Sequence, residues 1–581
     1  MMLGRNTSVL RAMAFLDTRE RIHLALTTVL RLLLVLLDLV GVTLVGIAIS
    51  IASGTTTSST SVTGKIIGYV TSLGFSHGYA VIALMAVIFF LSKAFLSIWL
   101  NHWMNDFSAR IEKQKATQVF KSIFAGSLDE IGAWTAEELN LGLLASFQTS
   151  FGTTLSTISA VFGELALIAV ISLFLAYSNF LAFAVLVAYF ALLAIAMHLI
   201  LNRKSGQLGT ESTKNQLSAS TNIYDGIRNF RQVTTSGKSS FFTDSFTDAR
   251  SKVAVLNSRQ MTISMMPRYI MEVALMVGIG ALISQLSTRN VANLTPATVA
   301  VFVAGAFRIV GSLLPLQGYL ALLKHSEANS KLSLDLCEQY LVKSGAVDDD
   351  LPLSPKTLNP PEIVFRNVSY RYPSRSRLAN SNISLKINPG DFIAVRGRSG
   401  SGKSTFTDLL LGLRRPLEGK VLINGIPAWL FVKNNPGKIA YVSQSTPLFS
   451  GTLLENITLE RDHSKISWPM LQQSINQSHL FDLVEVLPEG LETMLSASAT
   501  QLSGGQIQRV GLARALYLDS SILILDEATS SLDIETEATI AENLERLKKT
   551  KTVVVVAHRD ATIKLANRTF EFAGGTVREV F

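Results

Sequence analysis

The sequence predicts a multidomain membrane protein, in which an all-α domain of six membrane-spanning helices precedes an α/β domain. Three observations support this fold class. The first 320 residues contain six apolar windows long enough to cross a bilayer. Beyond residue 361, short β-rich runs alternate with helical runs, as in α/β domains. Hydrophobic residues make up 48% of the 581 residues and charged residues only 16%, whereas soluble proteins carry about 25% charged residues.

The six predicted spans come from hydropathy and length. A bilayer core of about 30 Å requires a helix of roughly 20 apolar residues. The windows that meet this condition are residues 29–52, 79–100, 155–176, 181–201, 270–286 and 297–320.

The connections between these spans predict how the chain is oriented. The two long connections, after the second and fourth spans, are rich in Lys and Arg, whereas the short ones carry few basic residues. Basic loops tend to stay in the cytoplasm, so we expect both long connections and both termini there. Apolar residues recur at helical spacing in the long connections, which predicts that they extend the spans as helices. We expect a multi-pass protein of the cell membrane, specifically the bacterial inner membrane.

The net charge of +9 could indicate a nucleic-acid partner. The basic residues cluster between apolar runs, however, and form no stripe on a soluble domain. This pattern favours membrane lipids as partners and predicts no nucleic-acid binding. Because Cys337 is the only cysteine, the chain forms no intrachain disulfide.

A polar, proline-rich stretch at residues 344–361 predicts a linker between a transmembrane domain, residues 1–343, and a second domain, residues 362–581. The strand-like runs of the second domain suggest a largely parallel sheet. The predicted strands are residues 363–368, 392–396, 438–442, 522–525 and 552–557.

A glycine-rich motif follows the strand-like run 392–396. It reads G-x-x-x-x-G-K-S-T and precedes a helical pattern, which is the context that a phosphate-binding loop requires. Lys403 would reach the β- and γ-phosphates of a nucleotide, and Ser404 would ligate Mg²⁺. The alternative is an ordinary glycine-rich turn. The predicted ATP-binding residues of the loop are Gly397, Ser399, Gly400, Ser401, Gly402, Lys403, Ser404 and Thr405.

Two carboxylates end the apolar run 522–525. Asp526 is placed to hold the Mg²⁺ shell, and Glu527 to polarise the attacking water as general base. The alternative is that both residues cap the following helix, where acidic side chains are stabilised. The phosphate loop upstream favours the catalytic interpretation.

These motifs resemble the ATPase domain of ABC transporters. The run 502–506, Leu-Ser-Gly-Gly-Gln, is similar to the signature sequence of that family, through Ser503, Gly504, Gly505 and Gln506. The resemblance implies that Tyr372 stacks on adenine and that Gln444 joins the catalytic and Mg²⁺-binding groups. It further implies that His558 senses the γ-phosphate and that residues 530–533 form the D-loop.

A six-span domain before one such ATPase domain resembles the exporter-type half-transporter. The resemblance implies ATP and Mg²⁺ as cofactors and a signature that closes over ATP bound by the opposite subunit. The expected partner is a second half-transporter chain, preferably an identical one, although a different chain is possible. The sequence departs from the family in one place: residues 496–499, Ser-Ala-Ser-Ala, replace the usual Gly-Glu-x-Gly segment. The carboxylate that contacts the coupling helices is therefore missing.

Charged residues within the predicted spans are candidates for cargo contact, because buried charges in membranes tend to face the bundle interior. Arg268 and Glu272 lie four positions apart and could instead neutralise each other. Stretches that include these residues and Arg308 resemble bacterial flippases of polyprenyl-linked oligosaccharides. This resemblance implies a lipid-pyrophosphate glycan as cargo, with Arg308 at an anionic head group.

The function predicted first is therefore an ATP-driven exporter or flippase, which hydrolyses ATP at a dimer interface. The alternative cargo is a peptide, a lipid or a small hydrophobic compound. An importer with an exporter-like fold remains an alternative. So does a membrane-bound nucleotide sensor that moves no cargo.

Overall fold

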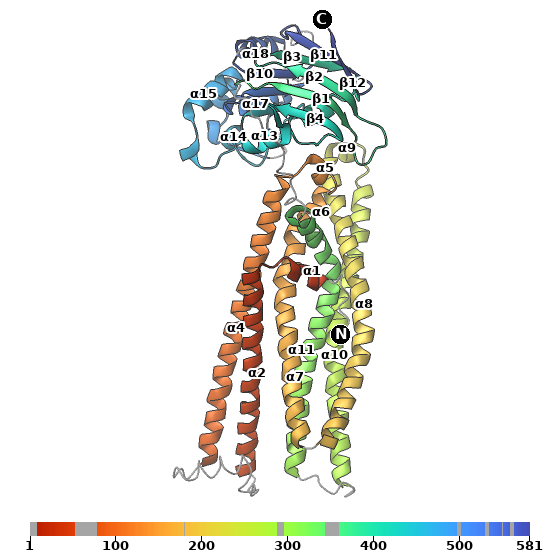
Figure 1. Ribbon diagram of the computed structural model, residues 1–581. Coiled ribbons are helices and arrows are strands. Elements are labelled where there is room, and N and C mark those ends of the chain that lie inside the picture. Colours follow the sequence, from red (N-terminus) through yellow and green to blue (C-terminus); the bar gives the residue numbers. More distant parts are fainter. Residues whose placement is uncertain are drawn as a thin grey trace. The chain divides into compact units, whose positions relative to one another are not determined.

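The computed structural model describes residues 8–52, 78–178, 180–287, 296–342, 359–496, 501–528, 534–548, 550–557 and 563–580 (Figure 1). The chain divides into two compact units, which we call the helical unit and the sheet unit. The helical unit comprises Met1–Ser122 and Trp134–Ala346, and the sheet unit comprises Val347–Phe581 together with Ile123–Ala133. A short segment from between two helices of the first unit thus belongs to the second.

Long helices build the helical unit, and each predicted span lies within one of them. In the part of the chain that the structure describes, they are α2 (Thr18–Ala52), α4 (Gly78–Ile123), α7 (Thr154–Ser178), α8 (Phe180–Arg228), α10 (Ser240–Ser287) and α11 (Pro296–Cys337). Shorter helices accompany them: α1 (Ser8–Ala14), α6 (Ala136–Leu141) and α9 (Phe230–Thr235).

Among the described residues, four helical stretches are long and apolar enough to cross a membrane. They are Val87–Ile123, Ala136–Tyr177, Phe183–Arg228 and Gly305–Val342. The fold class of an apolar helical region before a sheet-containing domain is confirmed, and the helical unit makes this a membrane protein. The count of six spans stays a prediction.

The helical unit is apolar inside and outside. Leu175, Phe190, Met271 and Val310, from α7, α8, α10 and α11, belong to one buried cluster. Large apolar side chains such as Leu192 are also exposed on the same helices. A helix that is hydrophobic on all faces is typical of a membrane span, because lipid covers its outer side.

Two π-helical turns precede α7, at Gly142–Ser146 and Gln148–Thr153. They pack against α11, where Ser150 Oγ lies 2.7 Å from Ser333 Oγ and the Ser333 N–H donates to Ser146 Oγ at 2.9 Å. Small hydroxyl side chains allow this close approach between the two helices.

Two sheets form the core of the sheet unit. The larger one has the strand order β12-β11-β3-β10-β9-β6 and is parallel apart from β12. Its strands are β3 (Phe392–Gly397), β6 (Ile439–Val442), β9 (Ile522–Asp526), β10 (Thr552–Val556), β11 (Arg568–Ala573) and β12 (Thr576–Val580). The smaller sheet is antiparallel and has the order β2-β1-β4-β5. Its strands are β1 (Ile363–Tyr370), β2 (Asn380–Ile387), β4 (Glu418–Ile423) and β5 (Ile426–Pro427).

Helices and a short strand pair complete the sheet unit. The helices are α5 (Leu128–Ile131), α12 (Lys403–Leu410), α13 (Ala428–Asn434), α14 (Leu453–Thr458), α15 (Trp468–Gln477), α16 (Phe481–Val486), α17 (Gly504–Tyr517) and α18 (Ile534–Arg546). Strand β7 (Gly451–Thr452) pairs with β8 (Met494–Leu495).

The larger sheet carries apolar side chains on both faces, and other elements of the sheet unit cover each face. Phe365 of β1, Phe406 of α12 and Val554 of β10 share one cluster, and on the opposite face Val553 packs with residues of α17 and α18. Every residue of β10 is buried. A central parallel strand covered on both faces is expected to be such a continuous apolar run.

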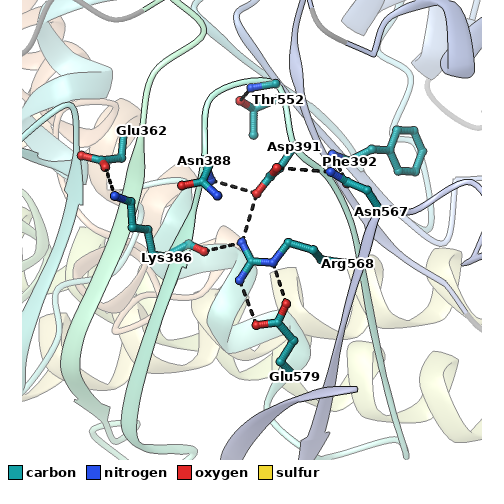
Figure 2. Close-up of polar contacts among 10 residues, drawn as sticks. Glu362, Lys386, Asn388, Asp391, Phe392, Thr552, Asn567, Arg568 and Glu579 are labelled. Atoms are coloured by element: carbon teal, nitrogen blue, oxygen red, sulfur yellow. Dashed lines mark hydrogen bonds and ion pairs between the residues drawn. The ribbon is translucent and has the colours of Figure 1, made fainter. Parts of the chain in front are cut away.

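A polar cluster fixes the start of β3 against the C-terminal hairpin. Arg568 bridges Asp391, at 3.0 Å, and Glu579, at 2.6 Å, as Figure 2 shows. Asp391 also accepts from the Asn388 N–H and from the Asn567 side chain. The cluster therefore joins the strand that enters the phosphate loop to β11 and β12.

Candidate nucleotide-binding site

The carboxyl ends of four parallel strands meet at one edge of the larger sheet. Strands β3, β10, β9 and β6 are neighbours in that order, so the residues that follow them converge. In open α/β sheets this edge is where ligands bind. The predicted phosphate loop follows β3, and the predicted carboxylates end β9.

Glycine backbone conformations shape the phosphate loop. Gly400 and Gly402 have φ angles of 77° and 108°, a region that residues with a side chain rarely adopt. A Cβ atom on Gly402 would also lie 2.6 Å from the Ala379 carbonyl oxygen. Helix α12 begins directly after the loop, so its N-terminal amides add partial positive charge.

Lys403, the first residue of α12, points into the loop. Its ammonium donates to the carbonyl oxygens of Gly397, at 2.6 Å, and of Arg398, at 3.2 Å. Burial lowers the pKa of Lys403, and the charges of Glu527 and Asp526 oppose that shift. A buried cation therefore stands within electrostatic range of both carboxylates.

The other loop residues differ in exposure. Ser401 and Thr405 are buried, whereas Ser399, Gly400 and Ser404 are exposed.

The hydroxyls of Thr405 and Tyr372 lie 2.9 Å apart. The structure thus ties the predicted adenine-stacking residue to the helix that follows the phosphate loop.

The two carboxylates have different environments. Asp526 ends β9, and its Oδ2 accepts from the Tyr441 hydroxyl at 3.4 Å. Burial, and secondarily the charge of Glu527, raise the pKa of Asp526. The Glu527 carboxylate accepts from Gln444 Nε2 at 2.6 Å, so the structure brings these two predicted residues together.

The signature residues form the start of α17. Ser503 is its N-cap, and the Ser503 hydroxyl accepts from the Gln506 N–H while the Gln506 side chain accepts from the Ser503 N–H. This reciprocal capping box explains locally why Ser and Gln occupy these positions. Leu502 is buried, and Ser503 and Gly504 are exposed, so the helix start is accessible.

Helix α17 contacts the loop that follows β6 through residues that were not predicted from the sequence. Gln508 is buried, and its side chain donates to the Gln444 carbonyl oxygen at 3.4 Å. A Cβ atom on Gly511 would lie 2.3 Å from Thr446 Oγ1, and Arg514 donates to the Pro447 carbonyl oxygen. In the sequence, Gln508 stands among apolar residues of a helical pattern. That position could have suggested a buried glutamine, but the sequence does not reveal which residue it contacts.

The hard oxygen donors at this edge fit the predicted metal. Ser404, Gln444 and Asp526 offer hydroxyl, amide and carboxylate oxygens, which Mg²⁺ prefers. Within the described ranges, no group of three or more His, Cys, Asp or Glu could hold a metal ion.

Several predicted residues lie outside the described part of the chain. They are His558, the D-loop residues 530–533, and residues 497–499 of the segment before the signature.

The predicted cargo residues lie in the helical unit. Arg268 Nε and Glu272 Oε1 are 2.9 Å apart in α10, and both side chains are exposed. This contact agrees with the pairing alternative. Arg308 lies half-buried in α11.

Comparisons with known proteins agree with this geometry. Residues 380–530 match the family model described as ABC transporter. The chain is 38% identical over 266 residues to an ATP-dependent lipid A-core flippase of Cupriavidus metallidurans, with 44% of each chain covered. It is 39% identical over 219 residues to the ABC-type transporter MDR1 of Aureobasidium melanogenum, with 37% of this chain and 16% of that protein covered. The chain thus spans less than half the length of these curated relatives.

One solved structure shares the fold over almost the whole chain. It is described as a bacterial Atm1-family ABC exporter with ATP bound, and it aligns with a TM-score of 0.69 over 97% of this chain and 94% of that chain. The sequence identity is 20%. At this identity the likeness shows that the two chains share a fold.

Proposed function

We propose that this chain is an ATP-driven exporter or flippase and that its C-terminal domain is an ABC transporter ATPase domain. The observation that carries the proposal is the convergence of Lys403, Asp526, Glu527 and Gln444 at one sheet edge. These groups suit the binding and cleavage of a nucleoside triphosphate. The fold also supports the proposal, because the chain shares it with a structure described as an ABC exporter.

The residues at the sheet edge divide the work of hydrolysis. The loop amides and Lys403 bind the phosphates, and Tyr372 stacks on adenine. Ser404, Gln444 and Asp526 would hold Mg²⁺, which neutralises phosphate charge when bound. Glu527 takes a proton from the attacking water, and Gln444 orients the Glu527 carboxylate. His558 is assigned to the γ-phosphate.

Two chains are needed for the complete reaction. Ser503 and Gly504 are exposed at the start of α17, a geometry suited to an anion. We assign them to ATP bound by a second half-transporter, preferably an identical chain. Both termini lie in the cytoplasm, and the protein resides in a bacterial inner membrane.

The proposed cargo is a lipid with an anionic glycan head group, such as a polyprenyl-linked glycan. Several relatives carry the name lipid A-core flippase, which favours amphiphilic cargo. Arg308 supplies a cation within the predicted sixth span, where it can meet a phosphate.

An ATPase assay of the purified chain in lipid nanodiscs tests this proposal. We expect Mg-ATP hydrolysis that rises with a lipid-pyrophosphate glycan and does not rise with a zwitterionic lipid of equal chain length. Arg308→Glu should remove the stimulation but keep the basal rate, whereas Arg250→Glu, at an exposed site of α10, should keep both. Intact stimulation in Arg308→Glu would exclude the assigned head-group contact.

A further inference from the structure

The segment Ile123–Ala133 joins α4 to the rest of the helical unit along the chain, yet it belongs to the sheet unit. It contains the short helix α5, which Ser127 and Glu130 stabilise through a capping box. The Leu128 N–H donates to the Leu413 carbonyl oxygen at 2.8 Å. A backbone hydrogen bond of this kind fixes the segment against the loop that follows α12.

An ion pair strengthens this attachment. Asp129 of α5 accepts from the Arg414 guanidinium and, at 2.6 Å, from the Tyr370 hydroxyl. The Arg414 and Asp129 side chains are only 14% and 23% exposed. Because solvent screens a mostly covered pair weakly, this contact is stronger than a surface ion pair.

Arg414 also reaches two parts of the nucleotide site. Its Nε donates to Asp408 Oδ2 at 2.8 Å, and Asp408 lies in α12, the helix that begins with Lys403. The Arg414 guanidinium carbon lies 4.8 Å from the centre of the Tyr372 ring, within the range of cation–π attraction. One side chain therefore contacts the inserted segment, the phosphate-loop helix and the predicted adenine-stacking residue.

We propose that Arg414 is a positioning residue that couples adenine recognition by Tyr372 to the inserted segment Ile123–Ala133. Asp129 and Asp408 hold two edges of the planar guanidinium, so its position over the Tyr372 ring depends on both. Lysine cannot reproduce this arrangement, because its ammonium lacks the planar fork. This inference rests on the proposed function, since it takes Tyr372 as the adenine contact.

Energetic coupling between two sites is reciprocal. Asp129 contacts Arg414, and Arg414 contacts the Tyr372 ring. If adenine binding favours one arrangement of these three side chains, then a substitution of Asp129 must alter the affinity for adenine. Asp129 itself lies in the inserted segment, outside the loop that holds the phosphates. An effect of Asp129 on recognition of the base is therefore a specific signature of this coupling.

The test compares binding of Mg-ATP with binding of Mg-tripolyphosphate, which lacks the base, to the full chain in nanodiscs. We expect Asp129→Asn and Arg414→Lys to raise the Kd for ATP about five- to twentyfold and to leave the Kd for tripolyphosphate within about twofold. Tyr372→Ala serves as the reference for loss of stacking. Glu137→Gln, in the first turn of the next helix, and Arg415→Lys, which lies over Trp429, are matched controls.

Two results would overturn the coupling. One is an unchanged Kd for ATP in Asp129→Asn, and the other is an equal loss of both ligands, which a merely structural role would produce. Failure of the proposed function looks different, because the unmodified chain would then bind neither ligand or Tyr372→Ala would leave ATP binding intact.

Discussion

Glu527 has a backbone conformation that residues with a side chain rarely adopt. Its φ angle is 50°, in the left-handed region, where such a residue costs about 1–3 kcal/mol. The Glu527 N–H donates to the Val556 carbonyl oxygen at 2.9 Å, which holds the turn in place. The strained turn directs the carboxylate toward Gln444. Strain of this kind is typical of functional sites.

The role of Glu527 as general base gives a direct prediction. Glu527→Gln should keep Mg-ATP binding, because the side chain retains its size, but should lower the steady-state hydrolysis rate by about 10²-fold or more. Malachite-green phosphate release and equilibrium ATP binding measure the two properties. Glu489→Gln, exposed on the same domain, is the control. Undiminished hydrolysis in Glu527→Gln would refute the assignment.

The raised pKa of Asp526 leads to a prediction of how Mg²⁺ binding depends on pH. Burial and the neighbouring Glu527 raise the pKa of Asp526, so protons compete with Mg²⁺ at a higher pH than for an ordinary aspartate. The apparent Kd for Mg²⁺ in the presence of ATP should therefore rise as the pH falls from 7 toward 5. Asp526→Asn should bind Mg²⁺ more weakly and with a flatter pH dependence. Identical pH profiles for the two proteins would count against Asp526 as a ligand.

At the scale of elements, the phosphate loop depends on one glycine more than on its neighbour. A Cβ atom at Gly402 would collide with Ala379 and Asn380, whereas a Cβ atom at Gly400 meets nothing within 4 Å. Gly402→Ala should thus raise the Kd for Mg-ATP by more than tenfold, about 1.4 kcal/mol or more, and Gly400→Ala by less. Isothermal titration of both variants measures the difference. Equal affinity in Gly402→Ala and the unmodified chain would show that this loop does not bind the nucleotide.

The Arg568 cluster stabilises the sheet that carries the loop. Arg568→Ala leaves the mostly buried Asp391 carboxylate without its guanidinium partner, and should lower the free energy of unfolding by about 1–3 kcal/mol. Arg578→Ala removes an ion pair to Glu571 from a side chain that is 74% exposed, and should cost less than about 1 kcal/mol. Urea denaturation of the full chain compares the two variants. A larger loss for Arg578→Ala would contradict this ranking.

Local patterns predicted the fold class and the residues proposed for the nucleotide site. The strands β3, β9 and β10 are continuous apolar runs, and the phosphate loop is a contiguous motif, so both can be read without tertiary information. The capping box of α17 is also local, because Ser503 and Gln506 lie within one helical turn. Such features depend on neighbours in sequence.

Long-range contacts could not be predicted in this way. Asp129 and Arg414 are 285 positions apart, and neither belongs to a recognisable motif. The antiparallel sheet was predicted only in part: the predicted strand 363–368 lies in β1, but its antiparallel partners were not predicted, and the exposed residues at the start of β4 hide the alternation of that strand. Asp129 is visible in the sequence, but its ion pair with Arg414 appears only in the structure.

At the scale of the whole molecule, the proposed function requires the two units to act together. In that proposal ATP is cleaved at the edge of the larger sheet, whereas cargo crosses the membrane among helices of the other unit. The segment Ile123–Ala133 lies between helices of the helical unit along the chain but belongs to the sheet unit. Transport requires that nucleotide state shift the equilibrium between two arrangements of the helical unit.

ATP-dependent lipid movement in proteoliposomes is the measurement that tests this account most directly. A fluorescent lipid-pyrophosphate glycan placed in the outer leaflet reports its leaflet through quenching, and ATP reaches only the outward-facing ATPase domains. We predict rapid loss of quenchable label in the unmodified chain with Mg-ATP, and none above background in Glu527→Gln. Equal rates in both proteins would contradict the claim that hydrolysis at this site drives the membrane helices.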